Sequence, residues 1–266
     1  MRVQFENVSF NYKNGAKVLH DINMDLDGPG LYCIIGPNGV GKSTLIKCIN
    51  KINKPTSGKV YLNGKDTSLM KQSEIAELVS YVPATTFDVF SMPVIDTIMV
   101  GRTNKQKWKV TPADLEIVNR AMRMLDLEDL AMRGYNELSA GQHQRVALAR
   151  GLVQETEIVL LDEPTANLDV KHQMYVTELL KAIADTTGKQ IIMICHDLNI
   201  AARYAEQIIV MGPPGIIYKT GRVEEVFTPE LISTIYGIDS QVIEFENKPF
   251  VLVGSTFGPD DDLWGE

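Results

Sequence analysis

The chain has 266 residues, of which 44% are hydrophobic and 23% are charged. These values are typical of soluble globular proteins and exclude disordered, collagen-like and coiled-coil chains. Lysine and arginine total 26 against 34 aspartate and glutamate residues, which gives a formal net charge of −8. Because an acidic chain is poorly suited to gripping phosphate backbones as its main task, no nucleic-acid partner is expected.

The three cysteines, Cys33, Cys48 and Cys195, lie within apolar stretches. An odd, sparse set of this kind favours reduced, buried thiols in a cytosolic compartment over a disulfide framework. No apolar run approaches the roughly 18 residues of a membrane span, and residues 1–6 have no signal-peptide core. The chain is therefore expected to be unexported, and any membrane role would come through partners.

Two segments within the first thirty residues alternate between apolar and polar residues, which predicts antiparallel strands. Their apolar faces are Val3, Phe5, Val8, Phe10 and Tyr12, and Leu19, Ile22, Met24 and Leu26. The continuous apolar run 31–35 predicts a strand buried on both faces, followed by a helix that begins near Lys42. Residues 60–62 before Asn63 and Gly64 predict a strand that enters a tight turn.

From about residue 85 to residue 154 the pattern is helical. Thr111 and Pro112 are typical of a helix start, and residues 140–153 predict a second long helix. On the first helix, the residues at helical spacing are Leu115, Val118, Met122 and Leu125. We expect a helical insertion over about 85–154, within a single domain over 1–257.

Strand-like runs return at 158–161 and 191–195, with a predicted helix over 170–184 between them. This order implies a parallel sheet with right-handed crossovers, and hence an α/β fold. Further on, the patterns predict a hairpin at Pro213-Pro214-Gly215 and a short helix opened by Thr228-Pro229. They also predict edge strands over 241–253, within a C-terminal β extension of about 238–254. The last residues, 258–266, are expected to form an acidic tail.

The segment Gly36-Pro37-Asn38-Gly39-Val40-Gly41-Lys42-Ser43 fits the pattern G-x-x-x-x-G-K-[ST], between a buried strand and a helix. Glycines let the backbone fold around phosphate oxygens, and the helix start directs N–H groups at them. In this pattern Lys42 reaches the β- and γ-phosphates and Ser43 ligates Mg²⁺. The segment predicts a nucleotide site.

The apolar strand 158–161 ends in two carboxylates, Asp162 and Glu163. A strand that ends in acids is more often followed by a helix cap than by a catalytic site. Together with the phosphate loop, however, it predicts that Asp162 holds Mg²⁺ and that Glu163 orients or deprotonates the attacking water.

Leu138-Ser139-Ala140-Gly141-Gln142 resembles the LSGGQ signature of ATP-binding cassette (ABC) ATPases, with alanine at the third position. The resemblance covers nearly the whole chain. It implies a P-loop NTPase cassette with a mainly parallel core sheet, an antiparallel β subdomain and an inserted helical subdomain. It also implies that Tyr12 stacks on adenine, that Asp169 closes a D-loop over 166–169, and that His196 contacts the γ-phosphate.

The same resemblance assigns the remaining parts of the site. Ser139 and Gly141 lie at the start of a predicted helix, an anion-binding end. In the family this end completes the ATP site of a second subunit, so a homodimer of cassettes is expected. The resemblance thus implies ATP and Mg²⁺ as cofactors. It implies that the catalytic residues are Lys42, Glu163 and His196, and that the metal ligands are Ser43 and Asp162. It further implies that the nucleotide is bound by Tyr12 and by Gly36 through Thr44, and that the signature in trans consists of Ser139, Ala140, Gly141 and Gln142.

One cassette without a membrane span resembles the separate ATPase subunit of an importer. Residues 94–102, 196–205, 226–231 and 236–237 resemble those of metal-chelate importers, which handle iron–siderophore complexes, haem and cobalamin. This implies uptake through a separate multi-span permease at the cytoplasmic face of the membrane, with a substrate-binding protein involved indirectly. The alternatives are a soluble regulatory or mechanical ATPase, or an importer of another substrate class.

Two local features are expected to affect coupling. Ala84 stands where cassette ATPases normally place a glutamine that contacts Mg²⁺ and the attacking water. Either Thr85 or Thr86 supplies a hydroxyl through a bridging water, or Ser43 and Asp162 suffice for the metal and solvent replaces the amide. We favour the second alternative. An apolar group in the following loop is expected either to contact the permease or to cover the core of the insertion. Its members are Phe87, Val89, Phe90 and Met92.

Overall fold

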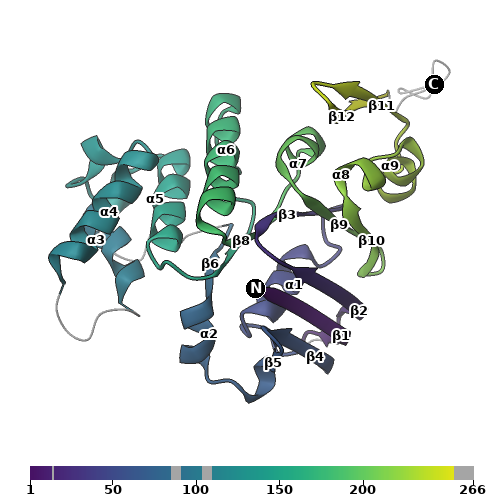
Figure 1. Ribbon diagram of the computed structural model, residues 1–266, viewed down its shortest axis with the longest axis horizontal. Helices are drawn as coiled ribbons and strands as arrows, with labels where there is room; N and C mark the ends of the chain where they lie inside the picture. Colours follow the sequence, from purple (N-terminus) through teal and green to yellow (C-terminus); the bar gives the residue numbers. More distant parts are fainter. Residues whose placement is uncertain (14, 85–90, 104–109, 255–266) are drawn as a thin grey trace, which may run out of the picture.

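The computed structural model describes residues 1–13, 15–84, 91–103 and 110–254, and its central element is a six-stranded sheet (Figure 1). The strand order is β10-β9-β3-β8-β7-β6, and all neighbours pair in parallel except β10 with β9. The strands are β3 (Gly30–Ile35), β6 (Val79–Val82), β7 (Ile158–Leu161), β8 (Gln190–Ile194), β9 (Gln207–Gly212) and β10 (Ile216–Arg222). The predicted parallel α/β sheet is confirmed.

Every residue of β3, β7 and β8 is buried, because helices or strands cover both faces of the sheet. On one face α6 (Val170–Thr187) and α7 (Leu198–Tyr204) pack in one hydrophobic cluster with the helices that lie between β6 and β7, which we call the helical block. On the other face α1 (Lys42–Ile49) packs in a second cluster with the N-terminal strands. The three cysteines are buried and free, and burial raises the pKa of Cys48 and Cys195 to about 12.

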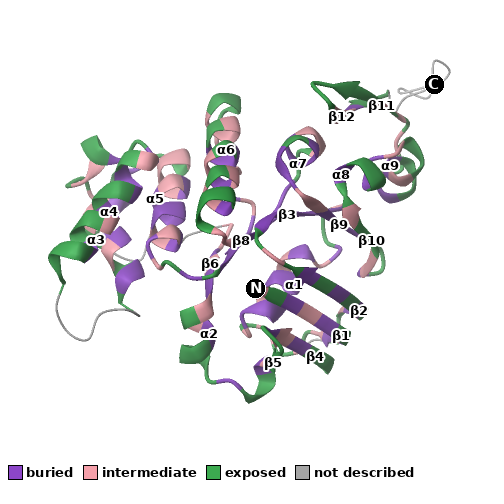
Figure 2. Cartoon of the chain, in the orientation of Figure 1, coloured by how far each residue is buried: buried purple, intermediate pink, exposed green. Residues whose placement is uncertain are grey.

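The N-terminal strands form a separate four-stranded sheet in the order β2-β1-β4-β5, which confirms the predicted antiparallel pairing. Its strands are β1 (Arg2–Asn11), β2 (Lys17–Asp27), β4 (Ser57–Leu62) and β5 (Lys65–Asp66). Alternating bands of buried and exposed residues run across β1 and β2 (Figure 2). A register shift between Phe5 and Val8, with Asn7 at φ 50°, turns both residues toward the core. Tyr12 was expected on the same apolar face, but 42% of it is exposed.

Helices dominate the segment between β6 and β7. They are α3 (Val94–Met99), α4 (Pro112–Met124) and α5 (Ala140–Leu152), with 3₁₀ turns η2 (Val100–Arg102), η3 (Glu128–Leu130) and η4 (Tyr135–Glu137); α2 (Gln72–Leu78) and η1 (Thr67–Leu69) come before β6. Thr111 caps α4 as predicted, and Val118, Met122 and Leu125 are buried. Leu115 is exposed, because it lies at the edge of the buried stripe of the helix.

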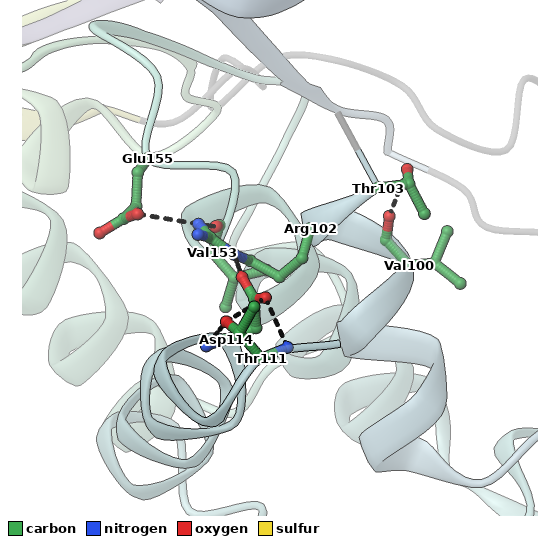
Figure 3. A network of polar contacts seen from close by, with 7 residues as sticks. All are labelled: Val100, Arg102, Thr103, Thr111, Asp114, Val153 and Glu155. Atoms are coloured by element: carbon green, nitrogen blue, oxygen red, sulfur yellow. Dashed lines mark hydrogen bonds and ion pairs between the residues drawn. The ribbon is translucent and has the colours of Figure 1, made fainter. Parts of the chain in front are cut away.

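An ion-pair network joins three parts of this block (Figure 3). Arg102 on η2 donates from Nε to Asp114 Oδ1 on α4 at 2.9 Å. Its Nη1 donates to the carbonyl oxygen of Val153 at 2.5 Å and to Glu155 Oε2 at 2.8 Å, both just beyond α5. Thr111 Oγ1 donates to the other oxygen of Asp114 at 2.6 Å. Because Arg102 and Asp114 are both buried, the network fixes η2, α4 and the end of α5 together.

The C-terminal region begins with α8 (Val223–Val226) and α9 (Pro229–Tyr236), the latter capped by Thr228 as predicted. Strands β11 (Ser240–Phe245) and β12 (Lys248–Val253) were expected as edge strands. They pair with each other in a two-stranded sheet that packs on α7, so each is an edge strand with a single neighbour.

The remaining sequence predictions fall in or near the loops. The turn Pro213-Pro214-Gly215 joins β9 and β10 as predicted, and α6 extends three residues beyond its predicted end at residue 184. Within the apolar group of residues 87–92, Met92 is partly exposed, and Phe87, Val89 and Phe90 lie outside the described residues, as do Thr85, Thr86 and the tail 258–266. In the described part of the chain, no helix combines the length and apolar character needed to cross a membrane.

Candidate nucleotide site

The loop that joins β3 to α1 depends on two glycines. Gly36 has φ 144°, and a Cβ atom there would lie 2.1 Å from the carbonyl oxygen of Met211. Gly41, the residue before α1, has φ 101°, and its Cβ would press against Val18 and Leu19 at 2.9–3.0 Å. Since only glycine fits both the conformation and the space, these residues set the loop path that points backbone N–H groups outward from the start of α1.

Lys42 lies at the first position of α1, and its ammonium group turns back over the loop. Nζ donates to the carbonyl oxygens of Gly36 at 2.7 Å and Pro37 at 2.8 Å, and the residue is buried. Burial lowers the pKa of Lys42, while the carboxylates of Glu163 and Asp162 act in the opposite direction. The loop thus holds a positive charge at the place where phosphate oxygens are expected.

Asp162, directly after β7, is buried and is held by hydroxyl groups at both of its oxygens. Ser43 Oγ donates to Oδ1 at 2.8 Å, and the hydroxyl of Tyr81 on β6 donates to Oδ2 at 3.2 Å. Hydroxyl and carboxylate oxygens side by side are ligands that Mg²⁺ prefers, and Mg²⁺ is commonly bound by one or two carboxylates together with phosphates and waters. The pair Ser43–Asp162 therefore fits the predicted metal site.

No larger metal-binding cluster accompanies this pair: the described residues contain no group of three or more histidine, cysteine, aspartate or glutamate side chains able to hold a metal. Sequence reasoning assigned no role to Tyr81. A hydroxyl within a buried strand, three residues before Ala84, was the signal that could have identified it. Ala84 itself is partly buried and offers no polar side-chain atom.

Glu163 and His196 meet across the ends of two neighbouring strands. Glu163 follows Asp162 after β7, His196 lies just beyond β8, and Glu163 Oε1 is 2.6 Å from His196 Nε2. Glu163 has φ 54°, a left-handed conformation that is uncommon outside glycine, and Gln144 Nε2 of α5 donates to its carbonyl oxygen at 3.3 Å. Both side chains remain partly exposed, so the pair is open to a ligand on the phosphate loop.

Tyr12 lies at the edge of the same region. Its hydroxyl is 3.1 Å from Thr44 Oγ1 in the first turn of α1, and its ring meets the Phe10 ring edge-on at 4.9 Å. An aromatic ring that is fixed at two points and still partly exposed is suited to stacking on a flat base.

The signature residues line a different hollow, of about 450 Å³, together with the segment before α6. Ser139 caps α5: its Oγ accepts from the N–H of Gln142 at 3.3 Å, and Gln142 Oε1 accepts from the N–H of Ser139 at 2.8 Å. A Cβ on Gly141 would lie 3.2 Å from the carbonyl oxygen of Asn167, so α5 approaches that segment closely. The exposed residues at this helix start are Ser139 and Ala140.

Asp169 lies across this hollow and caps α6. Its Oδ1 accepts from the N–H of His172 at 2.9 Å, and this hydrogen bond, with the one to the imidazole, lowers the pKa of Asp169. The predicted site residues thus form two groups. Lys42, Ser43, Asp162, Glu163 and His196 come together at the carboxyl ends of the parallel strands, whereas Ser139, Ala140, Gly141, Gln142 and Asp169 surround the separate hollow.

Comparison with known proteins identifies the family. The sequence model of the ABC transporter family matches residues 19–166, which contain the phosphate loop, the signature and both carboxylates. The chain belongs to the ABC transporter family. As a cassette of this family it binds and hydrolyses ATP.

Individual relatives cover almost the whole cassette. An uncharacterized ABC transporter ATP-binding protein of Methanocaldococcus jannaschii is 39% identical, with 95% of this chain and 98% of that protein covered. A probable siderophore transport system ATP-binding protein of Bacillus subtilis is 34% identical, with 91% and 88% covered. Among solved structures, a dimeric ATP-binding cassette in a post-hydrolysis state bound to ADP and Pi is 28% identical, with 83% of this chain and 98% of that chain covered and a TM-score of 0.76.

Proposed function

We propose that this cassette is the ATPase subunit of an importer that takes up a metal chelate of the iron–siderophore, haem or cobalamin type. The observation that carries its ATPase role is the convergence of Lys42, Ser43, Asp162 and Glu163, with His196 at 2.6 Å from Glu163. The substrate class is supported by the similarity to the siderophore transport protein of B. subtilis.

Each residue has a proposed task in hydrolysis. Backbone N–H groups of residues 36–44 and the ammonium of Lys42 bind the phosphates, and Tyr12 stacks on the adenine. Glu163 accepts a proton from the attacking water, and His196 holds the carboxylate in place and contacts the γ-phosphate. Ser43 and Asp162 would hold Mg²⁺, which when bound neutralises charge on the β- and γ-phosphates.

The active unit is proposed to be a homodimer. The signature hollow presents the N-terminus of α5, where N–H groups and the helix dipole favour an anion. It is separate from the phosphate loop of the same chain, so its anion is the ATP bound by a second copy. The solved relative that carries ADP and Pi is itself dimeric, which supports this arrangement.

The cassette is further proposed to lie at the cytoplasmic face of the membrane, attached to a separate multi-span permease. A substrate-binding protein outside the membrane would deliver the chelate to that permease. Residues 1–257 would form one domain, with the helical insertion over about 85–154 and the β extension over about 238–254. These assignments are supported by the similarity to ATP-binding proteins of ABC transporters, one of them from a probable siderophore transport system.

Two variants test the chemistry. Lys42→Ala should weaken nucleotide binding, because the phosphates lose a positive partner. Glu163→Gln should bind ATP but turn over more slowly by a factor on the order of 10²–10⁴, since general-base catalysis is lost. Wild-type turnover by Glu163→Gln would remove this carboxylate from the mechanism.

ATP-driven accumulation of a ferric siderophore in vesicles that contain the co-purified permease would support the import role, whereas an ATPase complex without any membrane protein would support the soluble alternative.

A further inference from the structure

The β11–β12 ribbon is attached firmly to the core of the cassette. The side chain of Asn199 on α7 bonds to Val251 of β12 twice: Oδ1 accepts from its N–H at 2.7 Å, and Nδ2 donates to its carbonyl oxygen at 3.2 Å. Arg203 on α7 also pairs with Glu246 in the ribbon turn at 2.6 Å. One face of the ribbon, with Val242 and Val251, packs against the hydrophobic core. The ribbon is thus a fixed part of the surface.

The opposite face of the ribbon carries four apolar side chains that are partly exposed, with Gln241 and Lys248 at its two ends. Cross-strand pairing places Ile243 beside Phe250, with Phe245 and Leu252 on the same face. Phe245 is 52% exposed, Ile243 and Leu252 are also exposed, and Figure 2 shows the ribbon mostly green. The rings of Phe245 and Phe250 meet edge-on at 5.9 Å. Large exposed apolar groups held on a rigid element are typical of a contact surface.

This face borders a groove of about 290 Å³ between the ribbon and the starts of α6 and α7. Its walls are mainly apolar: Phe245 and Phe250 line it from the ribbon, Val170 and Met174 from α6, and Ile200 from α7. Val170, the first residue of α6, is 75% exposed.

The position of the groove indicates what covers it. Asp197, which lines it, directly follows His196 of the phosphate site. Val170 directly follows Asp169, which lines the signature hollow. The groove therefore lies between the two half-sites of one cassette. In a two-fold dimer that joins each phosphate loop to the partner's signature, the surface between the half-sites lies nearest the axis, where each copy meets the same residues of the other.

We propose that the exposed face of the β11–β12 ribbon and its groove pack against the same surface of a second copy, as an apolar contact beside the two ATP sites. This inference rests on the proposed dimer and adds a contact to it that binds no nucleotide. Because the apolar surface would be removed from water on closure, it strengthens the ATP-bound dimer.

Dimer stability tests this contact in the Glu163→Gln background, where ATP remains bound. Phe245→Asp and Leu252→Asp should each raise the concentration for half-dimerisation, measured by light scattering with ATP, by about tenfold or more. Leu69→Asp is the matched control, because Leu69 is an exposed apolar residue on η1, far from the ribbon, and should leave dimerisation unchanged. ATP binding by each monomer confirms that the variants fold.

Labelling of an introduced cysteine identifies the covering surface, since the three native cysteines are buried. Ser139→Glu should keep the cassette monomeric, because it places a negative charge against the γ-phosphate of the ATP bound by the second copy. Phe245→Cys should react rapidly with a maleimide in this monomeric variant and slowly in the ATP-bound dimer. Equal dimerisation of Phe245→Asp, Leu252→Asp and their parent would overturn the ribbon contact and leave the dimer itself intact. Slow labelling already in the monomer would show that the chain covers its own ribbon, and this result would also overturn the ribbon contact. A parent that never dimerises with ATP would instead refute the proposed dimer.

Discussion

The hydroxyl of Tyr81 donates a hydrogen bond to Asp162 at 3.2 Å, on the carboxylate oxygen that Ser43 leaves free. Burial raises the pKa of Tyr81, so its hydroxyl stays protonated and remains a donor. Tyr81 is on β6, which leads through Ala84 into the helical block. The orientation of the proposed metal ligand is therefore tied to the strand that connects the core to that block.

Tyr81→Phe keeps the ring and removes only the donor. We expect the Mg²⁺ concentration that gives half-maximal ATP binding to rise about tenfold, because a hydrogen bond to a charged group contributes about 1.5–3 kcal/mol. ATP binding without Mg²⁺ should be unchanged. A fluorescent ATP analogue titrated with and without Mg²⁺ measures both quantities. Tyr61→Phe, which removes an exposed hydroxyl bonded to Glu6, is the control. Equal losses with and without Mg²⁺ would indicate a purely structural role for Tyr81.

Ala84→Gln restores the amide that the family normally places after this strand. Since Mg²⁺ normally keeps several waters, solvent can replace one lost amide at modest cost. We therefore expect turnover by the isolated cassette to rise less than about tenfold, or roughly 1.4 kcal/mol of barrier. Steady-state release of phosphate is the measurement. A gain of several hundredfold would show that the site lacks a needed ligand, and that solvent does not replace it.

Gly36→Ala should disrupt the phosphate loop, because the new Cβ would overlap the carbonyl oxygen of Met211 and the positive φ is strained for alanine. We expect ATP binding to be lost or strongly weakened. Gly28→Ala is a matched control: Gly28 also has positive φ, at 88°, but a Cβ there meets nothing within 4 Å. Isothermal titration with ATP compares the two variants, and equal affinities would contradict the steric argument.

Contiguous motifs account for the part of the site that sequence reasoning could predict. Residues 36–43 and 158–163 each contain the strand, the turn and the functional groups in one segment, so their local structure follows from their own residues. The parallel sheet was also predictable, because strand, helix and strand alternate along the chain. By contrast, the 2.6 Å contact between Glu163 and His196 joins residues from two strands, and only the pairing of β7 with β8 shows that they meet.

Features that depend on packing between distant segments were not predictable. Tyr12 has the period of a core residue, but it leaves the core because the register of β1 shifts before it. Strands β11 and β12 alternate as expected for edge strands, but the sequence did not indicate that Asn199 of α7 would hold them on the core. Tyr81 looks like an ordinary strand residue until β6 is placed beside β7, which brings its hydroxyl to Asp162.

The network around Asp114 predicts a pH-dependent contribution to stability. Hydrogen bonds from the Thr111 side chain and backbone, and then from Arg102, lower the pKa of Asp114 from 3.8 to about 2. Above about pH 4 the carboxylate is ionised in both the folded and the unfolded chain, so its contacts contribute fully. As the pH falls from 4 toward 2, the unfolded chain takes up the proton first and this contribution is lost.

Asp114→Asn should therefore lower the free energy of unfolding at pH 7, because Arg102 is left buried without its carboxylate partner. The difference between wild type and Asp114→Asn should stay constant down to about pH 4 and shrink between pH 4 and pH 2. Urea denaturation at several pH values measures it. Glu116→Gln provides the control, since Glu116 is an exposed carboxylate on the same helix; its difference from wild type should be small throughout. If the Asp114→Asn difference were the same at pH 3 as at pH 7, the pKa of Asp114 would not be lowered on folding, and the claim that Thr111 and Arg102 stabilise its ionised form would be wrong.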